Sequence, residues 1–557
     1  MRNIKSFTII RRIGGVLAAL MLAATMAGCN RGGLDPTATA TPVPTAAATE
    51  PAPQPGGTMT IAVPEGSAFA NPLLVTTREM SSLYHLVFES LLDTDDSGAP
   101  APCLAETWEQ GKDDLTWTFT LRTGVKWQRL GRELTAADVE FTFQQLKDLG
   151  DDKYWSFVTD YVKSCKAGDG NTVEVELKRP FYGALQALNF PIIPAGAGYE
   201  GGSAPDLPIG TGPYRVQAQS AAEITMEVNT DWWKKAPYIT TVKAVVYPDN
   251  ATAVSTLVLG SQLDAVQTDD LTVSQYRESG DANVYEYPTR YFEYLAFNFG
   301  SPDLQEKPVR QAIAYAIDRL EIVSYTYVNH AIVTDTPVPP DSWLYDGKVL
   351  KYTCDVTEAR RLIMLAGWQD NYDAKGEAGK DGYWDTSPDG VRRDLTFTLL
   401  TNRDETNTIR NDAALLIASQ LGKAGIRTEV KSVAWTDYDK MIKEKRFDLA
   451  LCGTYLSPVP DYRALLGSDG ELDVGGSATS DMDTLLADVL NSPDSASLKV
   501  KIGVLQNKII EDLPILCLYF RNHTLLTSND LKSLTGTVAG AREDDAYARI
   551  NQWYKVQ

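Results

Sequence analysis

Residues 104–139 read LAETWEQGKDDLTWTFTLRTGVKWQRLGRELTAADV. Large apolar side chains alternate with threonine over residues 116–121, a pattern typical of a strand with one buried face. Further along, Thr135 stands three residues before Asp138, and this spacing predicts the capping-box start of a helix. The stretch therefore predicts a strand followed by a capped helix, the alternation from which α/β layers are built.

The rest of the chain continues this alternation without an internal repeat. A helix is predicted from Pro308, at a first-turn position, to Leu320, and a further helix is predicted from Thr357, as its cap, to Gly367, as its end. We expect additional helices at residues 412–423, 438–445 and 498–512, and strands at residues 173–177, 395–400, 427–433 and 447–452. This order favours an open α/β fold.

Composition excludes several classes of function. The 557 residues include 52 Lys plus Arg against 73 Asp plus Glu, a net charge of −21, which argues against binding to nucleic acid or anionic lipid. The three histidines, His85, His330 and His523, are far apart in the sequence, so a multi-histidine metal centre is not expected. We expect no cofactor and no metal.

The N-terminal residues 1–28 have the pattern of an export signal. Four basic residues precede position 13, and residues 13–27 form an uncharged apolar run that is shorter than the roughly 20 residues of a spanning helix. The run ends in Met26-Ala27-Gly28-Cys29, which resembles a bacterial lipobox and predicts lipidation of Cys29. A membrane anchor helix is the alternative.

Residues 29–56 are rich in Pro, Thr, Ala and Gly and contain almost no large apolar side chain. Such a segment cannot bury enough surface to offset its ordering entropy, so it predicts a disordered tether. The folded part would then be held at the membrane by lipid.

The remaining five cysteines are Cys103, Cys165, Cys354, Cys452 and Cys517. Export permits disulfides, but an odd number leaves at least one thiol free. Five buried thiols are the alternative, and the pairing stays open at this point.

Sequence motifs for catalysis are not found. The chain has no GxSxG, HExxH or Walker motif, and no pair of carboxylates is singled out by its spacing. Gly196, Gly198 and Gly201 satisfy GxGxxG, but prolines surround them and no crossover helix follows, so a turn-rich loop is favoured over a dinucleotide site. Residues 373–385 only loosely follow a calcium loop, because Lys375 occupies a ligand position. The chain is therefore not expected to be an enzyme.

The opening stretch closely resembles the signature of the family 5 extracellular solute-binding proteins, which are peptide, nickel and oligosaccharide receptors of ABC importers. Further matches to this family follow in a fixed order over residues 57–557. They are Gly210-Thr211-Gly212-Pro213-Tyr214, Trp233, Lys235-Ala236-Pro237-Tyr238-Ile239, Phe297-Asn298, Val309-Arg310-Gln311-Ala312-Ile313, Ala366-Gly367-Trp368, Phe447-Asp448 and Leu513-Pro514-Ile515.

The resemblance implies an α/β, two-lobed periplasmic-binding-protein-like fold of type II, large cluster, with an extra subdomain inserted in the first lobe. We expect the first lobe at residues 57–91, 207–290 and 523–557, the insertion at residues 92–206, and the second lobe at residues 291–522. The chain would cross between lobes near Glu286–Phe292 and Phe520–Thr524, which would form the hinge. Ligand bound between lobes would shift the equilibrium towards a closed state.

The resemblance also implies binding residues. Trp435 matches a pocket tryptophan of the peptide receptors, with a core or surface position as the alternative. Thr454, Tyr455 and Ser457 lie in the loop where those receptors place an Asp for the free α-amine of the ligand. Here Ser457 is closest to that position and no acid lies between Asp448 and Asp461, so ordinary free-amine peptides are not favoured.

Four further positions are predicted from their places in the chain. Arg78 precedes a helix expected at residues 81–91, and Asn402 follows the strand at residues 395–400. Both have a solvated loop position as the alternative. Tyr291 and Tyr294 lead into the second lobe, where they would line the cleft or pack in the core.

The resulting expectation is a lipid-anchored receptor on the extracytoplasmic side of the cell membrane. It would act as a monomer, capture a peptide or peptide-like solute and deliver it to the permease subunits of an ABC importer. An oligosaccharide is the runner-up ligand, because 11 Trp and 26 Tyr can stack on sugar faces; chelated nickel is a weaker one. An extracellular hydrolase and a sensory or structural surface protein are the alternatives from other classes.

Overall fold

The computed structural model describes residues 53–557, without residues 76, 151–153, 156, 261, 349–351, 371–381, 387–390, 405–407, 537–541, 543–544 and 557. The predicted export signal, Cys29 and most of the predicted tether lie outside the described residues, as does most of the calcium-like stretch. No helix within the described ranges has the length and apolar character needed to cross a membrane.

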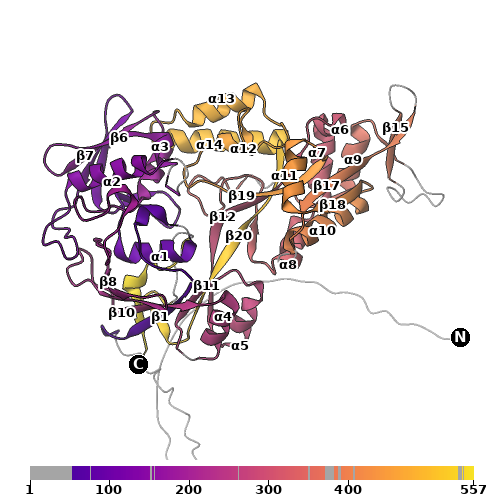
Figure 1. Ribbon diagram of the computed structural model, residues 1–557. Coiled ribbons are helices and arrows are strands. Elements are labelled where there is room, and N and C mark those ends of the chain that lie inside the picture. Colours follow the sequence, from indigo (N-terminus) through magenta and orange to yellow (C-terminus); the bar gives the residue numbers. More distant parts are fainter. Residues whose placement is uncertain are drawn as a thin grey trace, which may run out of the picture. The chain divides into compact units, whose positions relative to one another are not determined.

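The largest feature is a mixed sheet that extends through the described part of the chain (Figure 1). Its strands, in spatial order, are β18 (Arg427–Val433), β17 (Thr396–Asn402), β19 (Leu449–Tyr455), β12 (Asn283–Phe297), β20 (Ile515–Thr527), β11 (Ala265–Thr268), β1 (Thr58–Pro64), β10 (Thr241–Tyr247), β9 (Glu223–Val228) and β8 (Tyr214–Gln219), with β13 (Ala331–Val333) paired to β20.

Two long strands, β12 and β20, join the two halves of this sheet. The start of β12 and the end of β20 lie together beside β11, whereas the end of β12 pairs with β19. The regular register between β12 and β20 is interrupted between Pro288 and Phe292. Proline has no N–H to donate to the ladder, so an interruption here is expected. The two expected crossovers fall on these strands, and the lobe boundaries stay a prediction.

A second sheet contains the strand from the opening stretch. It consists of β4 (Ala105–Gln110), β5 (Thr116–Leu121), β7 (Thr172–Leu177) and β6 (Val162–Ala167). Helix α2 (Ala136–Asp148) follows β5 and begins with the predicted capping box of Thr135 and Asp138. The strand and the capped helix predicted from the sequence are thus confirmed.

The remaining strands form three small sheets. They are β2 (Leu92–Thr94) with β3 (Pro100–Pro102), β14 (Gln369–Asp370) with β15 (Tyr383–Thr386) and β16 (Arg392–Asp394), and β21 (Leu531–Ser533) with β22 (Trp553–Lys555).

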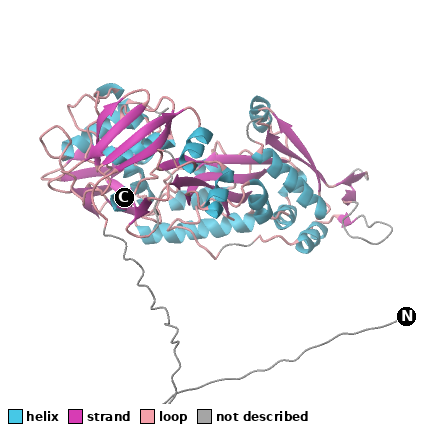
Figure 2. Cartoon of the chain, turned by 90° about the horizontal axis from the view of Figure 1, so that it is seen from below, coloured by secondary structure: helices cyan, strands magenta, loops and turns pink. Residues whose placement is uncertain are grey.

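Helices are interleaved with the strands, as expected of an α/β protein (Figure 2). The other α-helices are α1 (Arg78–Val87), α3 (Val158–Tyr161), α4 (Asn250–Val258), α5 (Ser274–Ser279), α6 (Pro302–Gln305), α7 (Lys307–Ala316), α8 (Arg319–Thr326), α9 (Val356–Leu365), α10 (Ile409–Lys423), α11 (Trp435–Lys443), α12 (Arg463–Leu466), α13 (Ser480–Val489) and α14 (Ser495–Asp512). Short 3₁₀ helices are η1 (Pro72–Leu74), η2 (Tyr182–Asn189), η3 (Glu200–Gly202), η4 (Leu271–Val273) and η5 (Ile550–Gln552).

Six predicted helices have wrong boundaries. The helices expected at residues 412–423, 438–445 and 498–512 each begin three residues earlier, as α10, α11 and α14. The helix from Pro308 to Leu320 is divided into α7 and α8, because Asp318 caps a new helix by accepting a hydrogen bond from the Glu321 N–H. Helix α9 is capped by Asp355, not by Thr357. Helix α1 begins at Arg78, three residues earlier than predicted.

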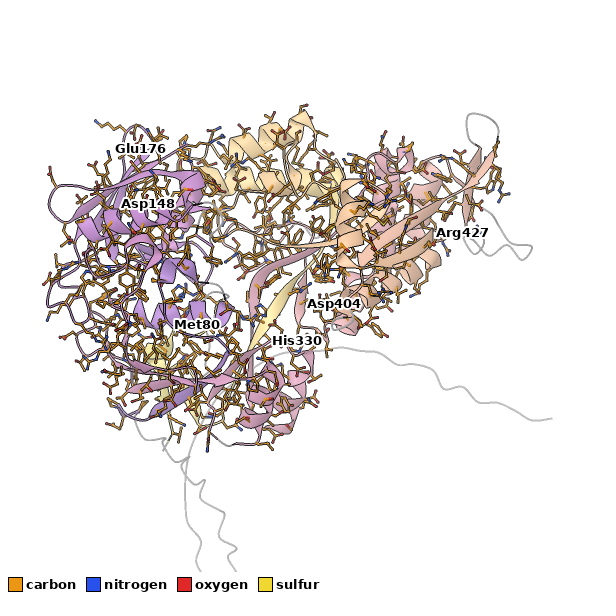
Figure 3. All side chains as sticks on the ribbon, in the orientation of Figure 1. Met80, Asp148, Glu176, His330, Asp404 and Arg427 are labelled. Carbon is orange, nitrogen blue, oxygen red and sulfur yellow. The ribbon has the colours of Figure 1, made fainter. Side chains whose placement is uncertain are left out.

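Buried side chains fill the space between these elements (Figure 3). The largest core cluster extends from β1 and α1 through Tyr287 and Phe292 on β12 to Tyr438 on α11. A second cluster lies around helices α7, α9 and α10, and a third, smaller one lies around α4. The middle of β12 therefore forms one boundary of the largest core cluster, and packing against this cluster holds its residues in place.

Candidate functional site

Two tyrosines face each other where β12 passes β19. Tyr291 and Tyr455 are directly opposite in the antiparallel ladder, their ring centroids are 5.2 Å apart, and both side chains are exposed. Arg290 donates a hydrogen bond of 2.6 Å from Nη2 to the Tyr455 hydroxyl and lies over its ring. The pair thus presents aromatic surface that is held in position but not covered.

A buried carboxylate lies next to this pair. Glu293, on β12, is 2% exposed and contacts two guanidinium groups, Arg410 from α10 and Arg521 from β20. The Arg410 Nη2 lies 2.8 Å and 3.0 Å from the two carboxylate oxygens. Burial opposes a charge on Arg410, but Glu293 outweighs this effect and raises the pKa of Arg410. Both arginines therefore remain protonated.

Gly453 leaves space for the Arg410 guanidinium, and Asn402 forms a hydrogen bond with it. Gly453, directly opposite Glu293 in the ladder, leaves no room for a side chain, because a β-carbon there would lie 2.2 Å from Nη2 of Arg410. Asn402, at the end of β17, accepts a hydrogen bond of 3.0 Å from Arg410. Trp435, the first residue of α11, is 48% exposed, and Arg410 lies 5.8 Å from its ring centroid.

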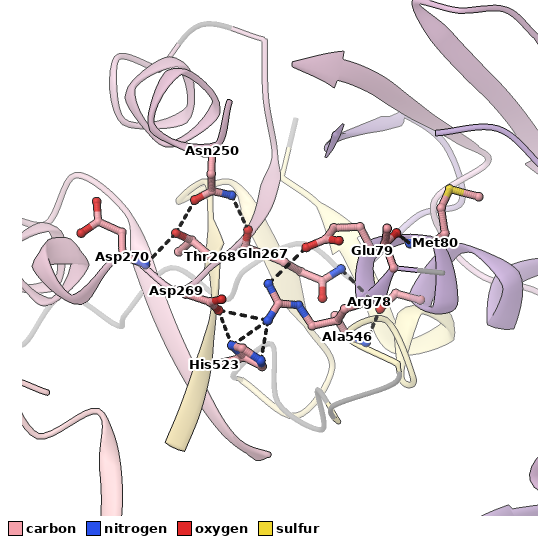
Figure 4. A network of polar contacts seen from close by, with 12 residues as sticks. Arg78, Glu79, Met80, Asn250, Gln267, Thr268, Asp269, Asp270, His523 and Ala546 are labelled. Atoms are coloured by element: carbon pink, nitrogen blue, oxygen red, sulfur yellow. Dashed lines mark hydrogen bonds and ion pairs between the residues drawn. The ribbon is translucent and has the colours of Figure 1, made fainter. Parts of the chain in front are cut away.

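On the other side of Tyr291, a polar network surrounds Arg78 (Figure 4). Arg78 lies 3.0 Å from Asp269, 3.1 Å from Glu79 and 2.7 Å from Nδ1 of His523, which also contacts Asp269. Burial and the adjacent Arg78 lower the pKa of His523. Burial raises the pKa of Asp269, but His523 and Arg78 outweigh it and hold this pKa at about 2.

The two networks are connected through Tyr291. Its ring lies 6.0 Å from the ring of His523 and 5.8 Å from the guanidinium of Arg521. A continuous strip of side chains therefore runs from Arg78 on α1 to Trp435 on α11. We refer to these residues as the cleft strip: Arg78, Asp269, His523, Tyr291, Arg521, Glu293, Arg410 and Trp435.

Ser457 lies beside a cavity of about 450 Å³ at the same crossing of the chain. The cavity is lined by Thr289 and Arg290 of β12, by Asp93 to Gly98, and by Asp341 and Ser457. Ser457 is exposed, and its hydroxyl accepts a hydrogen bond from the Val459 N–H at 3.2 Å. The volume of this cavity is in the range of small-molecule binding sites.

The structure brings most of the predicted residues together, and Tyr294 and Thr454 are the two exceptions. Some of the predicted residues belong to a different secondary-structure element from the one expected. Tyr294 is 2% exposed and stacks on Phe292 in the core, which is the alternative stated for it. Thr454 is half-buried. The predicted loop at Thr454 and Tyr455 is wrong, since both belong to β19, and Asn402 ends β17 instead of following it.

Five residues of this strip were not singled out from the sequence: Asp269, Glu293, Arg410, Arg521 and His523. Arg521 and His523 fall within the expected crossover at Phe520–Thr524 and are two positions apart on β20. Side chains two positions apart on a strand point to the same face, so the sequence could have indicated that both residues face Tyr291. Glu293 and Arg410 are 117 residues apart, and no local pattern joins them.

The arrangement is suited to binding, with few features of a reaction centre. Among the described residues, no cluster of three or more His, Cys, Asp or Glu side chains could hold a metal ion. The GxGxxG glycines lie in a turn-rich loop with only the three-residue helix η3, so the dinucleotide site has no helix to support it.

The family model for bacterial extracellular solute-binding proteins, family 5 Middle, matches residues 99–472, more than half of the chain. The chain belongs to this family. Proteins of the family are non-enzymatic transport receptors, so the expectation that the chain is not an enzyme is confirmed. The extracellular hydrolase is thereby disfavoured.

Relatives of this family 5 solute-binding protein agree with the assignment. The oligopeptide-binding protein AppA of Bacillus subtilis is 26% identical over 506 residues, covering 86% of this chain and 89% of AppA. The dipeptide-binding protein of Escherichia coli is 27% identical over 422 residues, covering 70% of this chain and 74% of that protein.

A solved structure shows the same fold. The structure of B. subtilis AppA in complex with a nonapeptide aligns with a TM-score of 0.60 and 24% identity, covering 91% of this chain and all of AppA. The expected α/β, two-lobed periplasmic-binding-protein fold is confirmed.

Proposed function

We propose that this family 5 solute-binding protein captures a peptide or peptide-like solute between its two lobes and delivers it to the permease of an ABC importer. The cleft strip carries this proposal, because it brings aromatic planes and charged groups from α1, β12, β20, α10 and α11 to one surface. The peptide-binding relatives support the class of ligand.

The proposed hinge is the pair of crossings on β12 and β20. The lobes would be residues 57–91, 207–290 and 523–557 on one side and residues 291–522 on the other, with residues 92–206 as the inserted subdomain. The break in register between Pro288 and Phe292 supports this position, because fewer ladder hydrogen bonds resist bending there. A ligand that contacts both lobes only when they are closed would shift the equilibrium by its differential affinity.

We further propose that lipid on Cys29 holds the receptor on the extracytoplasmic face of the membrane. The lipobox-like sequence and the Pro-rich stretch after it support this anchor. Metabolic labelling with a radioactive fatty acid tests it: label should enter the wild-type protein and be absent from the Cys29→Ser variant. Equal labelling of both would contradict the anchor.

Ligand class is tested by a thermal-shift scan of the purified protein against tri- to hexapeptides and neutral oligosaccharides. A ligand at about 100 times its dissociation constant should stabilise the protein by roughly 2.7 kcal/mol. A shift with peptides is the expected result. A shift with sugars alone would overturn the peptide assignment and would favour the second ligand class, for which the exposed Tyr291, Tyr455 and Trp435 offer stacking surfaces.

A further inference from the structure

The proposed inserted subdomain, residues 92–206, lies against the proposed second lobe at a contact away from the crossings on β12 and β20. The N–H of Tyr182 donates a hydrogen bond of 2.7 Å to the carbonyl of Ser492. The N–H of Trp343 donates one of 2.8 Å to the carbonyl of Ser97. Both bonds join these two parts of the chain, and water could replace each of them if the parts separated.

A further hydrogen bond at this contact has a charged acceptor. The hydroxyl of Tyr161, at the end of α3, donates to Oδ2 of Asp461 at 3.0 Å. Arg463 holds this carboxylate, because its Nε lies 3.0 Å and 3.1 Å from the two oxygens and its Nη2 lies 2.6 Å from Oδ2. Burial and the charge of Asp461 raise the pKa of Tyr161, so its hydroxyl stays a donor. A bond to an ionised acceptor is stronger than one between neutral groups.

Apolar side chains pack around the bond between Tyr161 and Asp461. Phe181 and Ala184 from the inserted subdomain and Leu490 from the end of α13 are all buried. Together with Tyr161, they line a crevice of only about 20 Å³ between the two parts, which is room for about one water molecule. The two surfaces are therefore closely packed at this point.

This contact adjoins the cavity of about 450 Å³ described above. Pro460 and Tyr462, the neighbours of Asp461 in the chain, line that cavity from the second lobe. Ser97, whose carbonyl accepts the hydrogen bond from Trp343, lines it from the inserted subdomain. The contact therefore closes one side of the space in which we expect the solute to bind.

We propose that Tyr161 and Asp461 form a latch that holds the inserted subdomain on the second lobe in the closed state and breaks when the cleft opens. The inference rests on the proposed receptor function and adds to it a role for residues 92–206. Arg463 remains paired with Asp461 after the latch breaks, so opening leaves no unpaired charge. By favouring the closed state, the latch raises the apparent affinity for a solute that binds this state.

The latch is tested in the purified protein, without added solute, by hydrogen exchange of the Tyr182 and Trp343 amides. Tyr161→Phe removes only the hydroxyl, and loss of a hydrogen bond to a charged group should lower the ratio of closed to open protein roughly tenfold to a hundredfold. Both amides should then exchange at least about tenfold faster, while the amides of β5 exchange as before. Small-angle X-ray scattering should show a larger radius of gyration. Unchanged exchange at either amide, or an unchanged radius, would overturn the latch.

Two further variants separate the latch from a general loss of stability. Tyr238→Phe is the matched control, because it removes a hydroxyl that accepts a hydrogen bond of 2.6 Å from Lys235 within the first lobe. It should leave the exchange and the radius as in wild type. Asp461→Asn removes the charge of the acceptor, so combining it with Tyr161→Phe should open the cleft by less than the sum of the two separate effects. Additive effects would contradict a direct bond between the two residues.

Peptide release then distinguishes failure of the latch from failure of the proposed function. A tri- to hexapeptide that raises the melting temperature of wild type should dissociate about tenfold faster from Tyr161→Phe, measured by surface plasmon resonance. Equal release rates would overturn the latch and leave the peptide receptor intact. Faster amide exchange in the variant, with no peptide bound by either protein, would leave the latch intact and overturn the peptide assignment.

Discussion

A β-carbon on Gly453 would lie 2.2 Å from Nη2 of Arg410, well inside van der Waals contact. The guanidinium thus occupies the place of a side chain on β19, directly beside Glu293. Replacing Gly453 with Ala should displace Arg410 and weaken its ion pair with the buried carboxylate. We expect a loss of about 2 kcal/mol in the free energy of unfolding, measured by urea denaturation, together with weaker ligand binding.

Gly422 provides the control for this substitution. It lies inside helix α10, close to its end, and a β-carbon there would meet no atom within 4 Å. Gly422→Ala should therefore stabilise the protein by about 0.5–1 kcal/mol, because Ala has the higher helix propensity. If both variants change stability alike, steric exclusion at Gly453 is not the cause.

The capping box at the start of α2 should be a major support of the four-stranded sheet on which α2 packs. The Asp138 side chain is 1% exposed and accepts hydrogen bonds from Arg132 at 2.7 Å and 2.9 Å, from the Trp127 indole at 3.1 Å and from two backbone N–H groups. Asp138→Ala leaves these donors unsatisfied and should cost about 3 kcal/mol in a chemical-denaturation experiment. Asp148→Asn, at the exposed end of the same helix, should change stability by less than about 0.5 kcal/mol.

The same capping box shows which parts of the fold the sequence can predict. Its residues are three apart, and β5 is six residues long with strict alternation, so the signals for both are local. Helix starts marked by competing caps were less certain: Asp355, two residues before Thr357, caps α9 instead. The order of strands in the large sheet depends on pairs such as Ala265 and Thr527, and no local pattern carries it.

The binding residues also divide into those that a local sequence pattern predicts and those that depend on distant contacts. Trp435, Tyr455 and Ser457 could be proposed because they fall in recognisable phrases of a known family. Glu293 had no such signal, because its role is defined by Arg410 and Arg521, which are distant in sequence and approach it only in the folded chain. Chemistry that is created by tertiary contacts therefore escaped prediction, and the strands β12 and β20 that carry Glu293 and Arg521 were not predicted either.

Acidification should destabilise the protein through His523. Burial and Arg78 lower its pKa, so the unfolded chain binds a proton at this residue more readily than the folded chain does. The neutral form predominates above the unfolded pKa of about 6.5, and stability is lost as the pH falls through the lower, folded pKa. The groups facing the ring are Asp269, Arg78, Tyr287 and Tyr291.

The measurement is the free energy of unfolding between pH 7 and pH 5. Wild type should lose up to about 1.4 kcal/mol per pH unit from this residue, and His523→Gln should show a flatter slope over that window. Identical slopes in both proteins would show that His523 is not the group responsible. Asp269 adds a separate loss only below pH 4, because its folded pKa is held at about 2.

The five remaining cysteines should all be free thiols with unequal reactivity. Cys354 is exposed, whereas the other four are buried, and burial raises the pKa of Cys103 to about 12 and that of Cys452 to about 11. In a protein with Cys29→Ser, Ellman's reagent should therefore react rapidly with one thiol in the native state. All five should react in denaturant without reductant; three or fewer would reveal a disulfide.

Ser457→Asp should create affinity for peptides with a free amine. Ser457 is exposed beside the cavity at the proposed hinge, so a carboxylate there would remain solvated in the empty protein and would pair with an ammonium group of a bound ligand. A charge-assisted hydrogen bond contributes about 1.5–3 kcal/mol, which corresponds to roughly tenfold to a hundredfold tighter binding of free-amine tripeptides than of their N-acetylated forms.

Calorimetric titration of both forms measures this ratio, with Ser457→Asn as the uncharged control of equal size. Wild type and the Asn variant should show no preference for the free amine, because neither provides a charge to replace the water lost by the ammonium group. A preference that already exists in wild type would mean that another acid, such as Asp341 on the same cavity, already binds the amine.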